Sequence, residues 1–329
     1  MVIRTAFTDL VGCTVPIQQA AIGSLANVRL AAAVADAGGL GLVSVAGLPP
    51  DLLTNVLQDL RSRTRGATGC NFLMPFVEDD VAECVTIAAQ HVRVIDFFWG
   101  EPDEALVSTV HRHGALACWQ IGSVEEAAAA ERAGCDFIIA QGIEAGGHVR
   151  GRIGVLPLLG RVLDAVHIPV LAAGGIADGR GLAAVLAAGA AGARIGTRFV
   201  ASVEADAHPI YVQALIDASA EDTVYTDRFS VDWPNAPHRV LRSSIEAAEA
   251  FDGDIVGERT NRYTGQRFPV KRWAIGTALR TTTGAIEAMA LWAGEGVGSE
   301  QALQPAGHIV PEIVAEAESL LGAWTERLK

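Results

Sequence analysis

The sequence predicts an α/β protein, a (β/α)8 TIM barrel with a helical insertion after its eighth strand. Short apolar runs alternate with Ala-rich helical stretches up to about residue 200, and this alternation indicates parallel strands joined by right-handed crossovers. The runs number eight, which favours a closed barrel over a doubly wound open sheet. Half of the 329 residues are hydrophobic, which is enough to bury a large core.

The eight predicted strands are short apolar runs of Val, Ile, Leu, Ala and Phe. In chain order they are Pro16–Ala20, Leu40–Ala46, Thr68–Leu73, Val92–Trp99, Ala115–Ile121, Asp136–Gln141, Pro169–Ala173 and Ala193–Gly196. Helices are predicted between them, over Val28–Ala37, Pro50–Arg63, Val81–His91, Pro102–His113, Val124–Ala133, Leu156–Val166 and Gly179–Ala188.

After the eighth strand the chain becomes more polar and richer in Trp, Tyr, Arg and Asp. We predict that residues 203–283 form a mostly helical insertion that covers the site as a lid, with helices over His208–Ser219 and Ser243–Phe251. Residues 1–202 and 284–329 are predicted to form the barrel. A helix over Gly284–Trp292 and a closing helix over Pro311–Leu328 belong to this second part.

Charge and cysteine content exclude several classes of function. The net charge is −13 and no Lys or Arg cluster is visible, so nucleic acid is not an expected partner. The five cysteines form no CxxC pair, which argues against a metal site and a disulfide framework. The first residues lack the charged start and unbroken apolar stretch expected of a signal peptide, and no apolar run reaches the roughly 20 residues of a membrane span. We therefore expect a cytoplasmic protein that does not bind membranes.

The ends of the seventh and eighth strands predict a phosphate site. The seventh ends in Gly174 and Gly175 before a helix, and the eighth ends in Gly196 and Thr197. Barrels of this type often bind phosphate on these two loops, where bare backbone amides and a hydroxyl can donate to its oxygens. The alternative is that the glycines only form tight turns.

The loop after the sixth strand offers a titratable group. Gly146 and Gly147 form a flexible ridge that could lie against a flat ring, and His148 follows them. A histidine at the active end of a barrel titrates near neutrality and can take or give a proton. We predict that His148 is catalytic, the alternative being a histidine on a surface loop.

Three other strand ends can border a ring. Asn71 lies near the end of the third strand and offers a donor and an acceptor, unless it only forms an Asx turn. Ala21 and Ile22 follow the first strand. At the end of the fifth strand we expect Trp119 in the core and Gln120 facing the site.

These motifs resemble the nitronate monooxygenase (2-nitropropane dioxygenase) family over nearly the whole chain. The matching stretches are PIQQAAIG, AAAVADAGGLGLVS, GCNF, AQGIEAGGH, PVLAAGGIADGRGLAAVLAAGAAGARIGTRF and ALWAGEGVG. Two departures lie beside the expected ring. The family commonly has a Pro-Met pair where this chain has Ala21-Ile22, and small or hydroxyl residues where it has Trp119-Gln120.

The resemblance implies FMN held non-covalently in the barrel. It implies that Gly174, Gly175, Gly196 and Thr197 surround the flavin phosphate. Asn71 and Gln141 would contact the flavin, and His148 would be the catalytic acid or base. The glycine ridge and the residues at the other strand ends complete the predicted cofactor site. Its residues are Ala21, Ile22, Asn71, Gln120, Gln141, Gly146, Gly147, Gly174, Gly175, Gly196 and Thr197.

Three functions follow from this sequence. The first is oxidation of alkyl nitronates with O2 to carbonyl compounds and nitrite. The second is reduction of quinones or enoyl thioesters by NAD(P)H through the flavin. The third is a non-redox barrel that binds a sugar phosphate or acts as a phosphate-dependent aldolase or isomerase. The absence of Lys from the predicted strand ends disfavours a Schiff-base aldolase. The expected partners are a small molecule and O2, and a homodimer is one assembly compatible with the sequence.

Overall fold

The computed structural model describes residues 3–77, 80–299 and 302–327, and its main sheet is the predicted parallel barrel. The eight strands run in the order β1-β9-β8-β6-β5-β4-β3-β2. The barrel closes where Gln18 bridges Leu40 and where the Leu40 amide donates to the Ile17 carbonyl at 2.9 Å. The barrel strands are β1 (Ile17–Gln19), β2 (Gly41–Ser44), β3 (Thr68–Leu73), β4 (Val94–Phe98), β5 (Leu116–Ile121), β6 (Phe137–Gln141), β8 (Val170–Ala173) and β9 (Gly192–Ile195).

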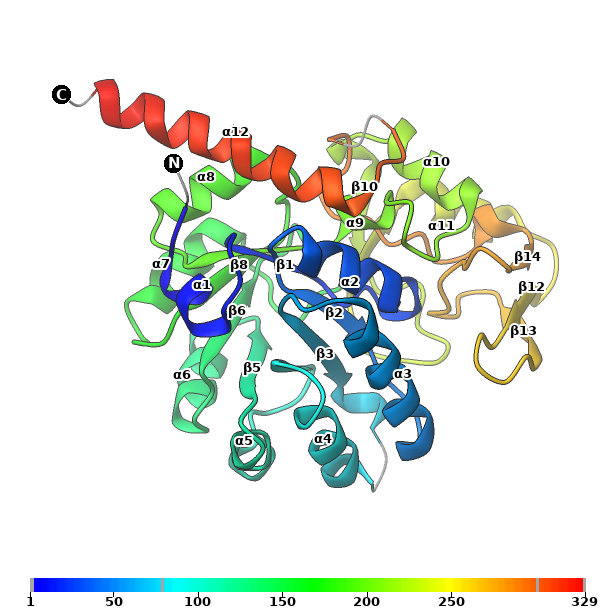
Figure 1. Cartoon of the computed structure of the whole chain (residues 1–329). Coiled ribbons are helices and arrows are strands. Elements are labelled where there is room, and N and C mark those ends of the chain that lie inside the picture. Colours follow the sequence, from blue (N-terminus) through cyan, green and yellow to red (C-terminus); the bar gives the residue numbers. More distant parts are fainter. Residues whose placement is uncertain (1–2, 78–79, 300–301, 328–329) are drawn as a thin grey trace.

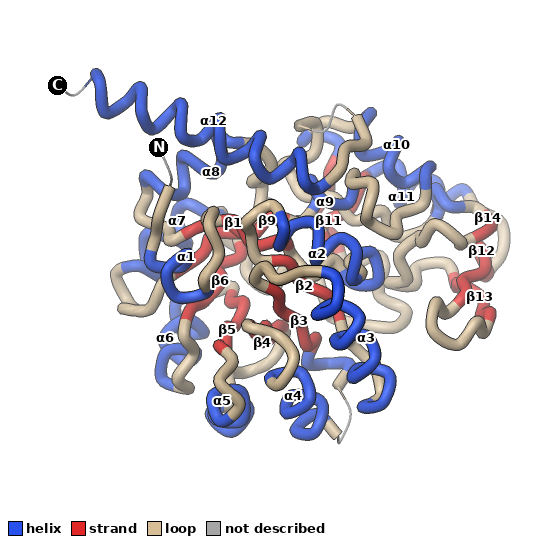
Figure 2. Tube along the Cα trace, viewed as in Figure 1, coloured by secondary structure: helices blue, strands red, loops and turns tan. Residues whose placement is uncertain are grey.

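A helix follows each of the first seven barrel strands, so the seven helices predicted between the strands are confirmed. Figure 1 shows the helices outside the sheet, and Figure 2 shows the strands gathered at the centre of the barrel. The surrounding helices are α2 (Val28–Asp36), α3 (Pro50–Arg63), α4 (Val81–Ala89), α5 (Glu104–Arg112), α6 (Val124–Arg132), α7 (Val155–Leu163) and α8 (Gly179–Ala187).

A short N-terminal helix that the sequence analysis did not predict closes one end of the barrel. It is α1 (Ala6–Val11), and Thr5 caps it with a capping box. Phe7 and Val11 pack with Leu42 and Phe137 from the inner faces of the strands. Six residues are too few for a periodic apolar pattern to stand out. With this end filled, the opposite end, where the strands finish, is left for a site.

The C-terminal helix α12 (Ala306–Arg327) completes the ring of helices by packing against α8 and α2 (Figure 1). It begins before the predicted start at Pro311, because the carbonyl of Pro305 accepts the His308 and Ile309 amides and starts the helix there. Pro311 therefore lies inside the helix. The predicted end, Leu328, lies outside the described residues.

The segment after β9 differs from the mostly helical insertion that we predicted. Both predicted helices are present, as α10 (Pro209–Asp217) and α11 (Arg242–Ala250), and a one-turn helix α9 (Thr197–Val200) precedes them. The segment also contains strands, so the mostly helical character is wrong. These strands are β10 (Thr223–Thr226), β11 (His238–Leu241), β12 (Ile255–Thr260), β13 (Arg267–Lys271) and β14 (Thr283–Gly284).

Local turn chemistry explains the β12–β13 hairpin. The side-chain oxygen of Asn261 accepts the amides of Tyr263 and Thr264 at 2.9 and 3.1 Å. Gly265 has φ +72°, a conformation that glycine adopts without strain. The Asx turn followed by this glycine reverses the chain direction, so that β12 and β13 pair antiparallel. The predicted helix over Gly284–Trp292 is also wrong, since only a 3-10 turn at Ile286–Ala288 forms there.

The insertion and the barrel share one small sheet. After β6 the chain forms β7 (Gly147–His148), which pairs antiparallel with β11, His148 opposite His238. The insertion thereby fixes the backbone that carries His148. The hairpin lies on the opposite side of the molecule from α6 and α7 (Figure 1). Among the described residues, no helix has both the length and the apolar character that a membrane span requires.

Candidate active site

The strand ends bring several of the predicted polar residues together at the open end of the barrel. Side chains alternate between the helical layer and the interior, so Asn71, Gln120 and Gln141 point inward, each about 5% exposed. Trp119 points outward, as expected of a core residue. Its ring stacks on Phe97 at 4.7 Å, and its Nε1 donates to the carbonyl of Gly100 at 3.0 Å.

An ion pair that the sequence analysis missed lies inside the barrel. Arg194 Nη1 on β9 is 2.7 Å from Asp96 Oδ2 on β4, and the two side chains are 6% and 0% exposed. Asn71 Nδ2 donates to the same carboxylate oxygen at 2.8 Å. The carboxylate of Asp96 therefore orients the Asn71 amide group. The Oδ1 atom of Asn71 takes no part in these hydrogen bonds. The sequence indicates this pair by one Asp and one Arg within otherwise apolar strands. A buried charge requires a partner of opposite charge, so the two residues could have been predicted to pair.

Gln141 holds the backbone of the His148 loop. Its Nε2 donates to the carbonyl of His148 at 3.0 Å, and its Oε1 accepts the Arg150 amide at 3.3 Å. Both ends of the amide are thus used within the protein. In this structure Gln141 acts on the loop that carries the histidine rather than offering free atoms to a ligand.

Aromatic rings enclose His148. Its ring centroid lies 4.1 Å from that of Trp233, 5.1 Å from Trp292 and 6.0 Å from Trp99, and His238 is 5.4 Å away. Burial, with a smaller contribution from His238, lowers the pKa of His148 to about 3. This differs from the titration near neutrality expected of a loop histidine. The imidazole is therefore neutral, and its buried Nε2 has no hydrogen-bond partner among the described residues.

Trp99 occupies a strained position at the end of β4. Its φ is +64°, which is uncommon for a residue with a side chain, and residues in such strained conformations cluster at functional sites. The ring lies 4.8 Å from Trp233, and the guanidinium carbon of Arg150 is 5.9 Å from its centroid. The sequence signal was a Trp-Gly pair at a strand end, which the sequence analysis treated only as the end of a strand.

The turn after β8 has the geometry that the phosphate prediction requires. Gly174 and Gly175 have φ +113° and +67°, so both need glycine. A Cβ on Gly175 would lie 3.3 Å from Glu144 Cβ, whereas one on Gly196 would have ordinary contacts of 3.6 Å with Ala20 and Ile22. The ends of β1, β8 and β9 therefore adjoin one another, with bare backbone between them.

Residues 294–297 are a component of this site that the sequence analysis did not assign. The Gly294 amide donates to Thr197 Oγ1 at 3.0 Å. A Cβ on Gly296 would lie 3.2 Å from the carbonyl of Gly175, so this segment rests on the turn after β8. The sequence pattern that could have indicated this segment is GEGVG, in which every second residue is glycine. It lies in the stretch ALWAGEGVG, which the sequence analysis used only to identify the family resemblance.

The two ridge glycines have different surroundings. A Cβ on Gly146 would meet the Gly294 amide nitrogen at 2.5 Å, so Gly146 is packed against protein. Gly147 has φ +74° and a Cβ there would meet nothing within 4 Å. Open space therefore borders Gly147, beside His148. Ala21 and Ile22 are half-buried after β1, and Ile22 lies next to Gly196.

These features fit a flavin mononucleotide. The glycine backbone at Gly174, Gly175 and Gly196, with the Thr197 hydroxyl, provides a surface on which an anionic group can approach the main chain. The open side of Gly147 could receive a flavin ring, and the unpartnered Nε2 of the next residue, His148, could then contact a bound substrate. Within the described residues, no three His, Cys, Asp or Glu side chains gather as a metal site would require.

The chain is similar to a known enzyme family and to a dehydrogenase. A family profile described as "Nitronate monooxygenase" matches residues 4–84 and 77–316. A (3aS,4S,5R,7aS)-5-hydroxy-7a-methyl-1-oxo-octahydro-1H-indene-4-carboxyl-CoA dehydrogenase from Rhodococcus jostii (strain RHA1) is 35% identical over 255 residues, 78% of this chain and 70% of that protein.

Two solved structures share the whole fold. FabK from Thermotoga maritima superposes with a TM-score of 0.80 at 30% identity and covers 99% of each chain. A nitroalkane oxidase from Streptomyces ansochromogenes superposes with a TM-score of 0.76 at 31% identity, covering 97% of this chain and 100% of that chain. These likenesses confirm the predicted barrel.

Proposed function

Because this chain belongs to the nitronate monooxygenase family and is a flavin-dependent oxidoreductase, we propose that it binds FMN at the open end of the barrel and acts on a CoA thioester. The proposed reaction is a two-electron oxidation of the acyl group, in which the carbon next to the thioester carbonyl loses a proton, the adjacent carbon loses a hydride to the electron acceptor, and a carbon–carbon double bond forms between them. The carboxyl-CoA dehydrogenase of Rhodococcus jostii, at 35% identity, supports this substrate class. The flavin supplies a two-electron acceptor when it is bound.

The proposed role of His148 is to remove the proton from the carbon next to the thioester carbonyl. Burial keeps the imidazole neutral, with a pKa of about 3, so Nε2 can accept a proton. A buried imidazolium alone would be unstable, but the anion formed beside it on the substrate would stabilise it by Coulomb attraction. Gln141 supports this role, since it fixes the His148 carbonyl at 3.0 Å.

The observation that carries the choice of substrate is the aromatic wall around His148. Trp99, Trp233 and Trp292 have ring centroids within 4.1–6.0 Å of the imidazole. Aromatic side chains favour contact with bulky apolar groups through the large area that they bury. A small nitronate anion has little apolar surface for such a wall, whereas a ring or branched acyl group can contact all three.

Nitronate oxidation is the second candidate. The family description and the 31% identical nitroalkane oxidase from Streptomyces ansochromogenes favour it. Here O2 would be the oxidant, and the products would be a carbonyl compound and nitrite. His148 would then remove the α-proton of a neutral nitroalkane or orient the preformed anion. A third candidate is a reductase. In that reaction NAD(P)H would reduce the flavin, and a quinone or an enoyl thioester would accept the electrons.

Anaerobic reduction of the purified yellow protein separates these candidates. An acyl-CoA with a bulky alicyclic acyl group, ethylnitronate, NADH and NADPH are mixed with it in parallel, and bleaching of the flavin absorbance is followed by stopped flow. The proposal expects the fastest bleaching with the acyl-CoA. Bleaching by ethylnitronate but not by the thioester would establish the second candidate instead, and bleaching only by a nicotinamide would establish the reductase.

A further inference from the structure

A second cleft lies between the barrel helices α2 and α3 and the β12–β13 hairpin. Its volume is about 300 Å³, and its lining includes Arg29, Arg63, Arg262 and Tyr263. These residues belong to neither the glycine turns nor the aromatic wall around His148. Arginines concentrated in one cleft are unexpected for a chain with a net charge of −13, because most of its surface repels anions.

The carboxylates in this cleft do not neutralise all of its arginines. Arg63 pairs with Asp59 at 2.9 Å, and Arg262 pairs with Asp206 at 3.2 Å. The remaining lining arginine, Arg29, has no carboxylate partner in the part of the chain that the structure describes. Its Nη2 donates to the backbone carbonyl of Glu204, at 3.3 Å. The cleft therefore keeps an uncompensated guanidinium at its edge.

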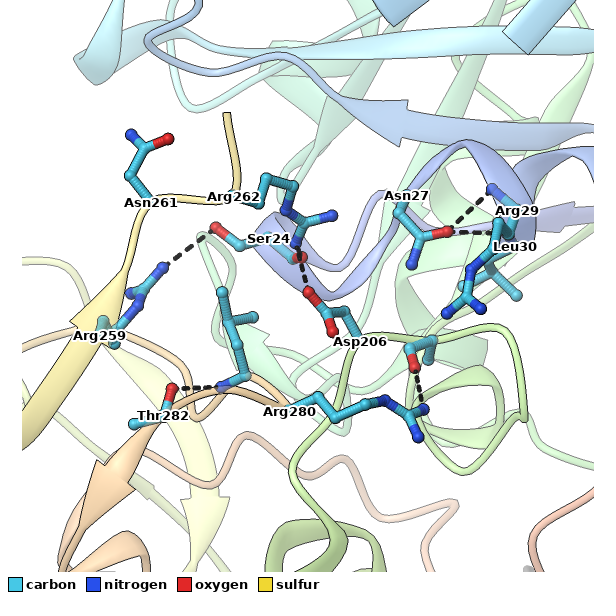
Figure 3. A network of polar contacts seen from close by, with 12 residues as sticks. Ser24, Asn27, Arg29, Leu30, Asp206, Arg259, Asn261, Arg262, Arg280 and Thr282 are labelled. Atoms are coloured by element: carbon cyan, nitrogen blue, oxygen red, sulfur yellow. Dashed lines mark hydrogen bonds and ion pairs between the residues drawn. The ribbon is translucent and has the colours of Figure 1, made fainter. Parts of the chain in front are cut away.

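A further arginine adds to this positive charge. Figure 3 shows Arg259 and Arg262 converging on Ser24, where Arg259 Nη2 is 3.4 Å from the hydroxyl and Arg262 Nη2 donates to the carbonyl. Arg259 Nε is buried without a hydrogen-bond partner among the described residues. Burial, and secondly Arg262, lowers the pKa of Arg259. Two guanidinium groups held at one serine repel each other, and an anion would relieve that repulsion.

We propose that this cleft binds an adenosine diphosphate group with an additional ribose phosphate, the chemistry that coenzyme A (3′-phosphate) and NADP(H) (2′-phosphate) share. Guanidinium groups match phosphate geometry and keep their charge in proteins. Tyr263 is 41% exposed at the cleft, and an exposed aromatic ring offers a face on which adenine can stack. This inference rests on the proposed function, because a CoA thioester is the proposed substrate.

The position of the cleft suits this role. The chain that leaves β1 passes Ala21 and Ile22 at the rim of the active site and then reaches Ser24. Ser24 accepts hydrogen bonds from Arg262, which lines the cleft, and from its neighbour Arg259. A ligand whose nucleotide end is held here can therefore extend along this loop toward the open end of the barrel. The loop from Ala21 to Ser24 therefore runs between the proposed flavin site and the cleft.

Calorimetric titration of the FMN-loaded protein tests the inference without relying on turnover. The ligands are coenzyme A, dephospho-coenzyme A, NADP+ and NAD+. We expect coenzyme A to bind more tightly than dephospho-coenzyme A. Arg29→Gln should weaken its binding by about tenfold or more, the loss expected for a hydrogen bond between charged groups. Arg29→Lys should restore part of the affinity, since it restores the charge.

A matched control comes from the same hairpin. Arg267 does not line the cleft and pairs with Glu258 at 2.5 Å, so Arg267→Gln should leave the Kd for coenzyme A unchanged. An Arg29-dependent affinity for NADP+ but not for coenzyme A would support the site and assign it to the nicotinamide nucleotide. Unchanged affinities in both Arg29→Gln and Arg262→Gln, or no binding of either phosphorylated ligand, would overturn the inference.

The outcomes also separate this inference from the proposed function. Coenzyme A could bind through Arg29 while no thioester bleaches the flavin, in which case the site stands and the proposed reaction fails. Thioesters could instead bleach the flavin with a Kd for coenzyme A that does not depend on Arg29 or Arg262. The proposed reaction would then stand, and this cleft would not be the nucleotide site.

Discussion

At the scale of single residues, the surroundings of His148 determine its protonation. The rings that enclose it belong to distant segments, Trp99 after β4, Trp233 between β10 and β11, and Trp292 between the 3-10 turn at Ile286–Ala288 and α12. The sequence could predict that His148 follows the sixth strand in a glycine-rich loop. It could not predict the rings, because no local pattern connects segments so far apart.

Replacing His148 should separate chemistry from cofactor binding. His148→Ala should retain FMN, because the proposed phosphate site lies on Gly174, Gly175, Gly196 and Thr197. It should lower the rate of anaerobic flavin reduction by roughly 10²–10⁴-fold for a substrate that must lose a proton. Preformed nitronate serves as the control, since its proton is already gone. Equal losses with nitroalkane and nitronate would contradict a role as base and favour positioning.

The low pKa of His148 predicts how stability varies with pH. In the unfolded chain the imidazole takes up a proton near a pH of about 6.5, whereas in the folded protein its pKa is about 3. Between these values the unfolded state binds more protons, so the free energy of unfolding falls as the pH falls, by up to about 1.4 kcal/mol per pH unit. Urea unfolding of the FMN-loaded protein from about pH 7 to about pH 4 measures this slope.

His148→Phe is the comparison for that slope. It removes the titrating group and keeps an aromatic ring among Trp99, Trp233 and Trp292. The slope should become smaller in the variant. It should not vanish, because burial also lowers the pKa of His238. An identical slope in both proteins would show that His148 does not have a depressed pKa.

The ion pair inside the barrel should be costly to break. Asp96→Asn leaves Arg194 buried without its carboxylate, so we expect a loss of about 3–5 kcal/mol in the free energy of unfolding. Asp59→Asn is the matched control, because its pair with Arg63 is exposed and should contribute less than about 1 kcal/mol. Equal small losses by urea unfolding would contradict the role assigned to the buried pair.

At the scale of elements, the sequence predicts the barrel well and the insertion poorly. Parallel strands that are buried on both sides are continuous apolar runs, so all eight barrel strands are recognisable in the sequence. Apart from the buried β11, the strands of the insertion are largely half-buried or exposed. β13, for example, is mostly exposed over Arg267–Pro269. Strands of this kind depend on cross-strand partners and turns, which composition does not reveal.

The turn after β8 offers an element-scale prediction. Gly175→Val should lower the FMN content of the purified protein, because φ +67° disfavours a side chain and the branched group would meet Glu144. Absorbance of released flavin per protein chain measures this content. Gly160→Ala in α7 is the control, because a Cβ there meets nothing within 4 Å. Unchanged flavin content in Gly175→Val would contradict the phosphate assignment.

At the scale of the whole molecule, the site requires both the barrel and the insertion. The barrel contributes the glycine turns after β8 and β9, and the insertion contributes Trp233 and the strand that pairs with His148. The division into a barrel of residues 1–202 and 284–329 and a covering insertion of residues 203–283 stays a prediction. So do the homodimer, the cytoplasmic location and O2 as a partner.

A flavin at the open end of this barrel is the central claim, and a crystal structure of the protein with FMN tests it most directly. We predict the phosphate about 3 Å from backbone nitrogens of Gly174–Gly175 and Gly196–Thr197, within hydrogen-bonding distance. The flavin ring should lie beside Gly147, with His148 facing the space left for substrate. A phosphate bound elsewhere, or a ring on the far side of the barrel from His148, would contradict this claim.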